Sequence, residues 1–274
     1  MLTAARSFAM SANSSPLLPQ PKELQPLWDW GVQPREGQLI QIAGRSGSQK
    51  SGFVLFWVAQ MGLPTLYFSG DMTSFEATSR LVSMQKGMTI AEIEAGLEHG
   101  RMAEYQQDLD ELPITFAFGE PITWSDIDAN IDAYMELHNC YPKIMVVDNL
   151  MDMAGCESGY EAQQAAWQDL TRVARETGMT VIVIHHATDK TEKGELLPGQ
   201  PPSRREIKNG GSEKPQLILT VALYSEEGMA QELRVACVKQ RSGKSDVAAK
   251  DIIRLMADPA RTRFWPRGSG MIRY

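Results

Sequence analysis

Apolar runs alternate with stretches of helical periodicity through the first two thirds of the chain. The apolar runs lie at 39–43, 64–69, 114–118, 143–148 and 181–184, and their composition and bounding residues are typical of buried parallel strands. Between them, apolar residues recur at helical spacing in the ranges 52–59, 75–86, 90–97, 101–112, 125–137 and 161–176. This alternation predicts an α/β protein with a mostly parallel central sheet flanked by helices.

The last quarter of the chain has a different pattern, because strand-like runs follow one another without helices between them. These runs lie at 217–223, 232–238, 251–255 and 262–265 and predict a C-terminal extension of antiparallel strands. Residues 189–203 form a polar loop rich in Pro, Gly and Lys that is too long for a mere connection.

The first residues, 1–24, are rich in Ser, Ala, Pro and Leu without a sustained period. We expect them to form a flexible or partner-docked arm, which leaves 25–274 as one domain. Trp28 and Trp30 are the first bulky residues of that domain, and they either cover the edge of the core or pack on a neighbouring subunit.

Composition narrows the class of protein. The chain has 274 residues, of which 43% are hydrophobic and 22% charged, as in ordinary globular proteins. A net charge of −7 argues against a surface coated with positive charge for nucleic acid, although a local basic loop or an oligomeric channel remains possible. The three scattered cysteines, Cys140, Cys156 and Cys237, predict reduced thiols rather than a disulfide framework or a zinc site. We expect neither a secretory signal nor a membrane anchor, and therefore a cytoplasmic protein.

A phosphate-binding loop is indicated between the first strand and the first helix. The sequence Gly-Arg-Ser-Gly-Ser-Gln-Lys-Ser resembles the P-loop pattern, in which backbone N–H groups and the helix N-terminus face the phosphates. Lys50 would reach the β- and γ-phosphates of ATP, and the Ser51 hydroxyl would help to hold Mg²⁺. The residues predicted to bind nucleotide are Gly44, Arg45, Ser46, Gly47, Ser48, Gln49, Lys50 and Ser51. Gln49 departs from the pattern, which has a second Gly there, and a Gly/Ser turn before a buried helix is the alternative.

Polar residues at the ends of other strands indicate the rest of the site. Asp148 ends an apolar strand, where a carboxylate would hold Mg²⁺ beside the P-loop hydroxyl. Asp71 follows the strand after the P-loop helix and could orient and deprotonate the attacking water, or simply cap a helix. His185 and His186 end a third strand and would point to opposite faces, so one of them could contact the γ-phosphate.

Two groups of basic residues could contact phosphates. Lys239 and Arg241 lie two apart on an extended segment and would point the same way, either toward one phosphate or into solvent at a hairpin end. A second group could track a nucleic-acid backbone or belong to a mobile surface loop, and its members are Lys190, Lys193, Arg204, Arg205 and Lys208.

In their order and spacing, these segments resemble the RecA-like ATPase core of the DnaB-type replicative helicases. The family's motifs correspond here to Gly44–Ser51, Ser69-Gly70-Asp71-Met72, Val146-Val147-Asp148-Asn149-Leu150-Met151, His185-His186 and Lys239-Gln240-Arg241-Ser242-Gly243. Arg80, the Gly-Met-Thr-Ile at 87–90 and Thr262-Arg263-Phe264 also stand where the family has similar residues. The resemblance covers 25–266, in a compact phage-like version for which we expect no N-terminal or primase domain.

The resemblance implies a role for each matching residue. Asp71 corresponds to the family's catalytic Glu, Asp148 to its Mg²⁺-binding acid and His186 to its γ-phosphate sensor. Arg241 corresponds to the arginine finger that enters the neighbouring subunit's site, with Lys239 assisting. The family therefore implies ATP and Mg²⁺ as cofactors, a homo-oligomer that is a ring (as a hexamer) or a filament, and single-stranded DNA in a central channel.

Two residues depart from the family's motifs, and three other functions remain as alternatives to the expected one. Asp71 is one methylene shorter than Glu, and Gln49 adds a side chain where φ > 0 is expected. We expect a DNA-dependent ATPase that translocates on single-stranded DNA. The alternatives are a recombination mediator that forms filaments without unwinding, a Mg²⁺-dependent nuclease that uses Asp71, Asp148 and Asp152, and a scaffold that does not hydrolyse nucleotide.

Overall fold

A sheet of nine strands runs through the centre of the described part of the chain. The structure is a computed structural model, and it describes residue 6 and residues 15–157, 159–188, 199–208 and 213–268. The strands lie in the order β3-β2-β4-β5-β1-β6-β7-β8-β9. Their bounds are β1 Leu39–Gly44, β2 Thr65–Ser69, β3 Ile114–Phe118, β4 Ile144–Asp148, β5 Thr180–His186, β6 Leu217–Tyr224, β7 Glu232–Gln240, β8 Ile253–Asp258 and β9 Arg263–Pro266.

The predicted fold class is confirmed. The first six strands in the sheet order are parallel, and β7, β8 and β9 extend the sheet in antiparallel fashion. Among the four strands predicted for the C-terminal extension, β6 differs because it pairs in parallel with β1 and so belongs to the parallel part. The strands β1, β2, β4 and β5 all end at one edge of the sheet, which is where ligands gather in open α/β sheets.

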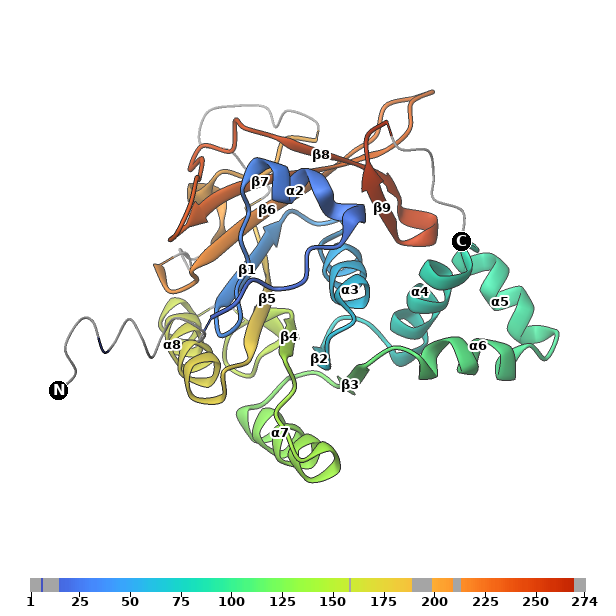
Figure 1. Cartoon of the computed structure of the whole chain (residues 1–274), viewed down its shortest axis with the longest axis horizontal. Helices are drawn as coiled ribbons and strands as arrows, with labels where there is room; N and C mark the ends of the chain where they lie inside the picture. The colour runs from blue at the N-terminus through green and yellow to red at the C-terminus, as the bar shows by residue number, and fades with distance from the viewer. Residues whose placement is uncertain (1–5, 7–14, 158, 189–198, 209–212, 269–274) are drawn as a thin grey trace.

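Helices cover both faces of the sheet (Figure 1). The helices α2, α3 and α4 pack over one face, where α2 contacts β8 and α3 contacts β9, and α7 and α8 pack over the other. The helices α5 and α6 pack on α4 and lie with it at one end of the molecule (Figure 1). The bounds are α2 Gln25–Trp30, α3 Lys50–Met61, α4 Ser74–Lys86, α5 Ile90–Glu98, α6 Met102–Asp110, α7 Trp124–His138 and α8 Tyr160–Thr177, with short 3-10 helices at Lys22–Leu24 (η1), Leu150–Asp152 (η2), Arg204–Glu206 (η3) and Pro259–Arg261 (η5).

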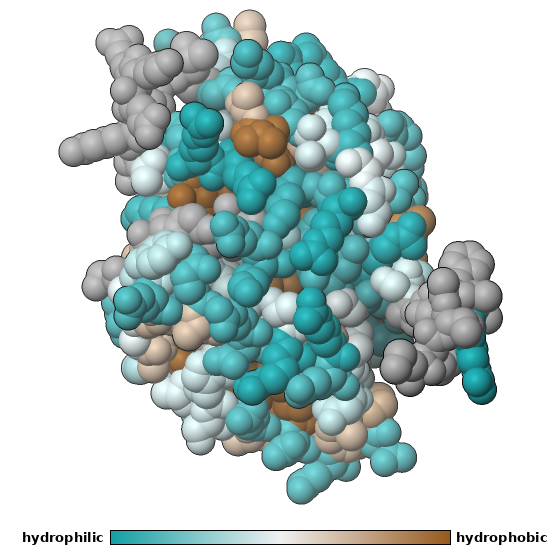
Figure 2. All heavy atoms as spheres, turned by 90° about the vertical axis from the view of Figure 1, so that its left-hand side faces the viewer, coloured by the Kyte–Doolittle hydropathy of each residue, from teal (hydrophilic) through white to brown (hydrophobic). Residues whose placement is uncertain are grey.

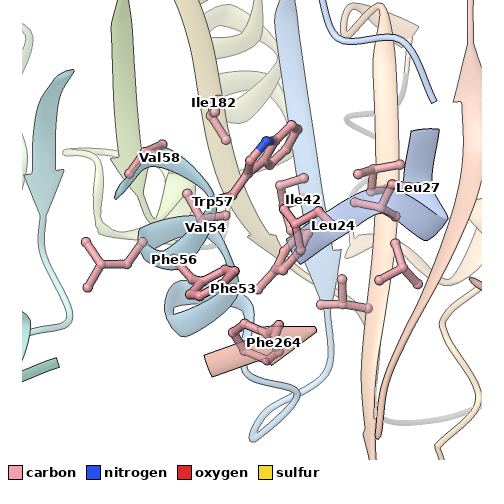
Figure 3. Packing of buried hydrophobic residues seen from close by; sticks show 14 of the residues in the cluster. Leu24, Leu27, Ile42, Phe53, Val54, Phe56, Trp57, Val58, Ile182 and Phe264 are labelled. Carbon is pink, nitrogen blue, oxygen red and sulfur yellow. The ribbon is translucent and has the colours of Figure 1, made fainter. Parts of the chain in front are cut away.

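The helix that follows the P-loop is the centre of the larger hydrophobic core. Helix α3 has buried residues on nearly all its sides, because it packs against β1, α4 and the outermost strand β9 (Figure 3). Trp57 is fully buried, and Phe264 of β9 meets the rings of Phe53 and Phe56 edge-on at centroid distances of 5.9 and 5.4 Å. The last strand of the sheet therefore anchors the helix that begins in the phosphate-binding loop.

Side-chain caps fix where three of the helices begin. Thr73, Thr89 and Thr123 each accept a hydrogen bond from the backbone three residues on, and the acid at that position bonds back. Helix α7 begins at Trp124, one residue before the Ser125–Asp126 start that the sequence predicts, because Thr123 and not Ser125 provides the cap. Strand β9 likewise begins after Thr262, whose left-handed backbone, φ 47°, ends a turn rather than a strand.

Residues 15–24 of the expected N-terminal arm lie against the domain. Leu18 and Leu24 are 1% and 0% exposed, and the Leu18 N–H donates to the Pro34 carbonyl at 2.9 Å. Trp28 is 9% exposed and stacks at an angle on Trp57, with ring centroids 6.1 Å apart, so it covers the edge of the core. Residues 1–5 and 7–14 of the expected arm lie outside the described residues.

The face that lies at the left in Figure 1 is mostly hydrophilic, and the hydrophobic residues coloured in that view form small, separate areas (Figure 2). Within the described ranges, no helix is long and apolar enough to cross a membrane.

Candidate nucleotide site

A cleft of 190 Å³ lies at the edge of the sheet where β1, β2, β4 and β5 end. It brings together the P-loop and the residues that follow three other strands. Its lining consists of Ser46, Gly47, Ser48, Gln49, Lys50, Ser51, Gly52, Asp71, Arg80, Asp148, Asn149, Ile184 and His186. Residues from separate stretches of the chain therefore meet here, and they include six of the eight predicted P-loop residues together with Asp71, Asp148 and His186.

The P-loop backbone has the tight geometry that a phosphate cradle needs. A Cβ atom at Gly44 would lie 2.4 Å from Ser48 Oγ and 2.8 Å from the Val221 carbonyl oxygen, so only glycine fits there. Gln49 adopts φ 63° and ψ 29°, the left-handed conformation that favours glycine. The chain thus keeps the backbone of the usual P-loop although it has Gln at this position, and it does so at a conformational cost of about 1–2 kcal/mol.

Asp148 is the acid nearest the P-loop. Ser51 Oγ donates to Asp148 Oδ1 at 3.0 Å, and the Tyr67 hydroxyl donates to Oδ2 at 2.8 Å. Burial raises the pKa of the Asp148 carboxyl to about 6, although these two hydrogen bonds lower it, and nearby Asp71 and Asp152 raise it further. A hydroxyl and a carboxylate in contact are oxygen ligands of the kind that Mg²⁺ prefers, so these residues fit a nucleotide-bound Mg²⁺ ion.

Tyr67 was not among the residues predicted from the sequence. It lies on β2, and its burial together with the Asp148 charge raises the pKa of its hydroxyl well above the usual value. The hydroxyl therefore stays protonated and acts as a hydrogen-bond donor. A phenol in the middle of a short buried strand was the only signal in the sequence that could have indicated this contact.

The two histidines at the end of β5 point to opposite faces, as predicted. His186 lines the cleft, whereas His185 is buried under α8 with its ring edge-on to Trp167 at a centroid distance of 6.1 Å. Burial lowers the pKa of His185 to about 4, so the ring is neutral, and its Nε2 atom lies 2.9 Å from the Lys208 carbonyl oxygen. Of the two histidines, only His186 lines the cleft.

Asp71, in the turn that follows β2, and Arg80 of α4 also line the cleft. Asp71 is exposed and close enough to raise the pKa of both Asp148 and Asp152. The neighbouring Gly70 leaves room for Asp152, because a Cβ atom at Gly70 would lie 2.6 Å from the Asp152 Cβ atom. Arg80 reaches the cleft from α4, and its Nη1 atom lies 3.1 Å from Met72 Sδ. Arg80 adds a positive charge to the cleft that sequence reasoning did not assign to it.

The side chain of Arg45 takes a different direction from the rest of the P-loop. Its guanidinium donates to the Thr188 and Gln200 carbonyl oxygens and forms an ion pair with Glu206 at 2.6 Å. Its backbone carbonyl accepts from Lys50 Nζ at 2.9 Å and from Ser48 Oγ at 2.7 Å. Arg45 therefore contributes backbone to the P-loop, while its side chain binds the segment that follows β5.

Lys239 and Arg241 lie at the opposite edge of the sheet from the cleft. The Arg241 N–H donates to the carbonyl of Gln216, whose own N–H donates to the carbonyl of Leu39, the first residue of β1. The P-loop begins at the other end of β1. At about 3.3 Å per residue that end is about 17 Å away, which is further than an arginine side chain reaches. The Arg241 side chain therefore does not reach the cleft of its own chain.

Arg241 is exposed in a hollow of 640 Å³ at this edge. The hollow is lined by Gln168, Thr171, Arg172, Arg175, Glu176, Glu213, Lys214 and Arg241. Lys239 donates from Nζ to the Glu213 carbonyl at 2.9 Å, and burial, with help from Arg204 and Arg241, lowers its pKa to about 8. Lys239 is thus close enough to Arg204 and Arg241 for their charges to act on it.

The described part of the expected DNA-binding group lies just after the long loop. Arg204 and Arg205 belong to η3, Arg205 is exposed, and Lys208 is half-buried. Lys190 and Lys193 lie outside the described residues. Over the ranges that the structure describes, no group of three or more His, Cys, Asp or Glu side chains is arranged to hold a metal ion by itself.

A protein-family model and two phage proteins match most of this chain. The family model of the DnaB-like helicase C terminal domain matches residues 30–264. The Gene 65 protein of Mycobacterium phage L5 is 30% identical over 241 residues, covering 85% of this chain and 88% of the relative. The Gene 65 protein of Mycobacterium phage D29 is 31% identical over 222 residues, covering 78% of this chain and 92% of the relative.

Two solved structures share the fold. One is described as an ATPase domain, and it has a TM-score of 0.73 and 16% identity, with a match that covers 95% of each chain. A DnaB-like replicative helicase, described with its interactions with primase, has a TM-score of 0.70 and 16% identity. The match covers 84% of this chain and 59% of that helicase, so this chain spans less than two thirds of its length.

Proposed function

The chain belongs to the family of the DnaB-like helicase C-terminal domain, and on that premise we propose that it is a DNA-dependent ATPase that couples hydrolysis to binding of, or movement along, single-stranded DNA. One observation carries the proposal. The P-loop, Asp71, Asp148 and His186 share a cleft, while Arg241 lies at the far edge of the same sheet. Such a division suits a site that is completed by a second copy of the chain.

In the proposed site the P-loop holds the phosphates. The N–H groups of 46–51 and the N-terminus of α3 face the β-phosphate, and the Lys50 ammonium neutralises the β- and γ-phosphate oxygens. Mg²⁺, when bound beside Ser51 Oγ and Asp148, would supply further charge neutralisation to the phosphates. Because Asp148 is buried and bonded on both oxygens, it presents a carboxylate whose position is fixed before nucleotide binds.

Asp71 and His186 act on the γ-phosphate side of this site. Asp71 orients the attacking water and accepts its proton, since it is the exposed carboxylate that faces the cleft. His186 donates a hydrogen bond to the γ-phosphate and so distinguishes ATP from ADP. The shorter side chain of Asp71 holds the water less closely than Glu would, and we expect slow turnover.

The arginine finger is proposed to act in trans. A finger at the far edge of the sheet can reach a nucleotide only if one copy docks its Arg241 edge against the cleft of the next copy. Such a head-to-tail contact is heterologous, and it generates a ring or a filament. We propose a ring, as a hexamer, or a filament in which Arg204, Arg205 and Lys208 line the path of single-stranded DNA.

The direct test is ATP hydrolysis measured with and without single-stranded DNA over a range of protein concentrations. We expect hydrolysis per subunit to rise with concentration and with DNA, and to be abolished in Lys50→Ala. Turnover of Lys50→Ala at the wild-type rate would contradict the P-loop assignment. Hydrolysis that is independent of both DNA and concentration would contradict a DNA-dependent site shared between subunits.

The same preparation separates the alternatives. Unwinding of forked DNA with ATP distinguishes a translocating motor from a filament-former that only binds. Cleavage of branched DNA with Mg²⁺ and without ATP would instead indicate a nuclease that uses the acids at 71, 148 and 152. Binding of ATP without turnover on any DNA would indicate a scaffold.

A further inference from the structure

The residue that precedes Arg241 anchors the turn to which Arg241 belongs. Gln240 is the last residue of β7, and it is 8% exposed. Its Nε2 atom donates to the Gly31 carbonyl oxygen at 2.9 Å, and its Oε1 atom accepts from the Gln33 N–H at 2.8 Å. The amide of Gln240 is therefore bound through both its polar atoms to one short stretch of backbone, 207 to 209 residues away in the sequence.

The stretch that receives Gln240 is fixed by the end of α2. The Gly31 N–H donates to the Trp28 carbonyl at 3.0 Å. The Val32 N–H donates to the Leu27 carbonyl at 2.9 Å, and both of these side chains are fully buried in the larger core. Gln240 thus ties the end of β7 to a part of the backbone that core packing holds in place.

The turn 241–244, which we call the finger loop, lies against this anchor. A Cβ atom at Gly243 would lie 2.0 Å from Gln240 Nε2, so the loop passes directly beside the bonded amide. At the far end of the loop, Lys244 Nζ lies over the ring of Trp30, 4.5 Å from its centroid. Helix α2 and the turn that ends it therefore contact the finger loop at both of its ends.

The anchor also sets the direction of the Arg241 side chain. Successive side chains of an extended segment point to opposite faces, so Gln240 and Arg241 must diverge. Gln240 reaches the turn after α2, whereas Arg241 lines the hollow with Gln168 and Arg172 of α8, on the other face of the sheet. Fixing the amide of Gln240 therefore fixes the backbone from which Arg241 extends.

We propose that Gln240 is a positioning residue that orients Arg241 toward the nucleotide of the neighbouring copy, through its two hydrogen bonds to the turn after α2. This inference rests on the proposed function, because it needs Arg241 to act as a finger in trans. Gln240 acts through the backbone of the finger loop and donates nothing to the phosphates. Its loss should leave the P-loop of its own copy intact and impair the finger that this copy supplies.

Gln240→Met keeps the length of the side chain and removes both hydrogen bonds. With ATP and single-stranded DNA, we expect kcat to fall by about 100-fold and KM to stay unchanged, because a misplaced catalytic group slows the reaction without altering the cleft that binds ATP. Gln163→Met is the matched control. Gln163 is 1% exposed and its Nε2 atom donates to the Cys156 carbonyl at 2.7 Å, but it lies near the start of α8, and both constants should keep their wild-type values.

Mixing of variants separates a misplaced finger from a general defect. Gln240→Met keeps its own P-loop and Lys50→Ala keeps its own finger, so boundaries that combine the two should hydrolyse ATP. Gln240→Met mixed with Arg241→Ala supplies no correctly placed finger, and this mixture should stay slow at every ratio. A merely structural loss in Gln240→Met would damage its P-loop as well, and Lys50→Ala would then restore nothing.

A spin label on the finger loop gives a readout that needs no ATP. Ser242→Cys can be labelled with a nitroxide in a Cys140→Ser background, because the other two cysteines are buried. The label should be more mobile by electron paramagnetic resonance in Gln240→Met, and unchanged in Gln163→Met. Gly243→Ala displaces the same amide from the side of the loop and should act in the same direction. It keeps the test open if urea unfolding shows that Gln240→Met does not fold.

The outcomes separate the inference from the proposed function. Wild-type kcat in Gln240→Met and Gly243→Ala, beside an inactive Arg241→Ala, overturns the inference and leaves the proposed function standing. Unchanged mobility of the label, or a Gln240→Met that Lys50→Ala does not restore although it restores Arg241→Ala, overturns it too. Arg241→Ala at the wild-type rate overturns the finger in trans, and the inference with it. A slow Gln240→Met with a mobile label, restored by Lys50→Ala, supports the inference.

Discussion

The hydroxyl of Tyr67 donates a 2.8 Å hydrogen bond to Oδ2 of Asp148, across two neighbouring strands of the sheet. The bond holds a buried carboxylate in place and offsets part of the cost of its burial, which raises the pKa of Asp148 to about 6. The proposed Mg²⁺-binding acid is therefore positioned by a side chain outside the residues predicted from the sequence.

Tyr67→Phe should raise the pKa of Asp148 further in the metal-free protein. The variant removes a hydrogen bond to the ionised carboxylate, and loss of that bond favours the protonated form. NMR titration of the Asp148 carboxyl should give a midpoint near 6 in the wild-type chain and a higher one in the variant. Tyr105→Phe is the control, because the buried Tyr105 hydroxyl has no hydrogen-bond partner, and it should leave the midpoint unchanged. Equal midpoints in all three proteins would contradict the proposed role of Tyr67.

Asp148→Asn should stabilise the metal-free fold at neutral pH while it abolishes ATP hydrolysis. A carboxyl whose folded-state pKa is raised from 3.8 to about 6 binds its proton more tightly in the folded state. Its stabilising contribution is complete below pH 3.8 and is lost as the pH rises toward about 6. This difference in pKa corresponds to about 3 kcal/mol as an order of magnitude.

Urea unfolding at about pH 5 and about pH 7.5 tests this effect of Asp148→Asn, because the two values lie on either side of the folded-state pKa. The free energy of unfolding of the wild-type chain should decrease between these pH values by more than that of the variant. A variant that is less stable than wild type at the higher pH would show that the ionised carboxylate is net stabilising, against our expectation.

Gln49→Gly should raise the free energy of unfolding by about 1 kcal/mol, because the left-handed conformation at φ 63° is strained for Gln and free for Gly. It should also tighten nucleotide binding, since it removes a side chain from the cleft. Asn139→Gly is the control, because Asn139 is an exposed helix-capping residue at φ 53° that does not line the cleft, and it should change stability slightly without changing nucleotide affinity. Weaker ATP binding by Gln49→Gly would show that the Gln side chain assists the nucleotide.

Arg241→Ala should bind ATP normally and hydrolyse it very slowly, because in the proposed assembly the finger acts in the next subunit's site. Mixing it with inactive Lys50→Ala should restore part of the activity, since some boundaries then combine an intact P-loop with an intact finger. ATP hydrolysis measured across mixing ratios gives the result. Activity that stays at zero at every ratio, or Arg241→Ala alone at the wild-type rate, would rule out a finger acting in trans.

Phe264→Ala should destabilise the fold by about 3–5 kcal/mol, since it deletes a ring that is 1% exposed and packed on Phe53 and Phe56. Phe118 is 41% exposed, so Phe118→Ala should cost far less. Thermal or urea unfolding compares the two variants. Similar losses would indicate that β9 contributes little to anchoring α3.

The sequence alone determined the architecture, because its signals are local. Secondary structure is set within a few residues by the period of apolar positions, by capping residues and by glycines. Once the strands are parallel, they must end at one edge of the sheet. The α/β fold and the convergence of the P-loop, Asp71, Asp148 and His186 at one cleft therefore followed from the order of the segments. Even the left-handed backbone at Gln49 was foreseeable from the motif.

Only the tertiary structure decided which side chains support that cleft. Tyr67, 81 residues before Asp148, and Arg45, 161 residues before Glu206, meet their partners through packing of distant segments, which leaves no period in the sequence. The same holds for the parallel pairing of β6 with β1, which places Arg241 at the far edge of the sheet. Contacts of this kind depend on strand order and register, and those are set by the summed burial of the whole core rather than by any local pattern.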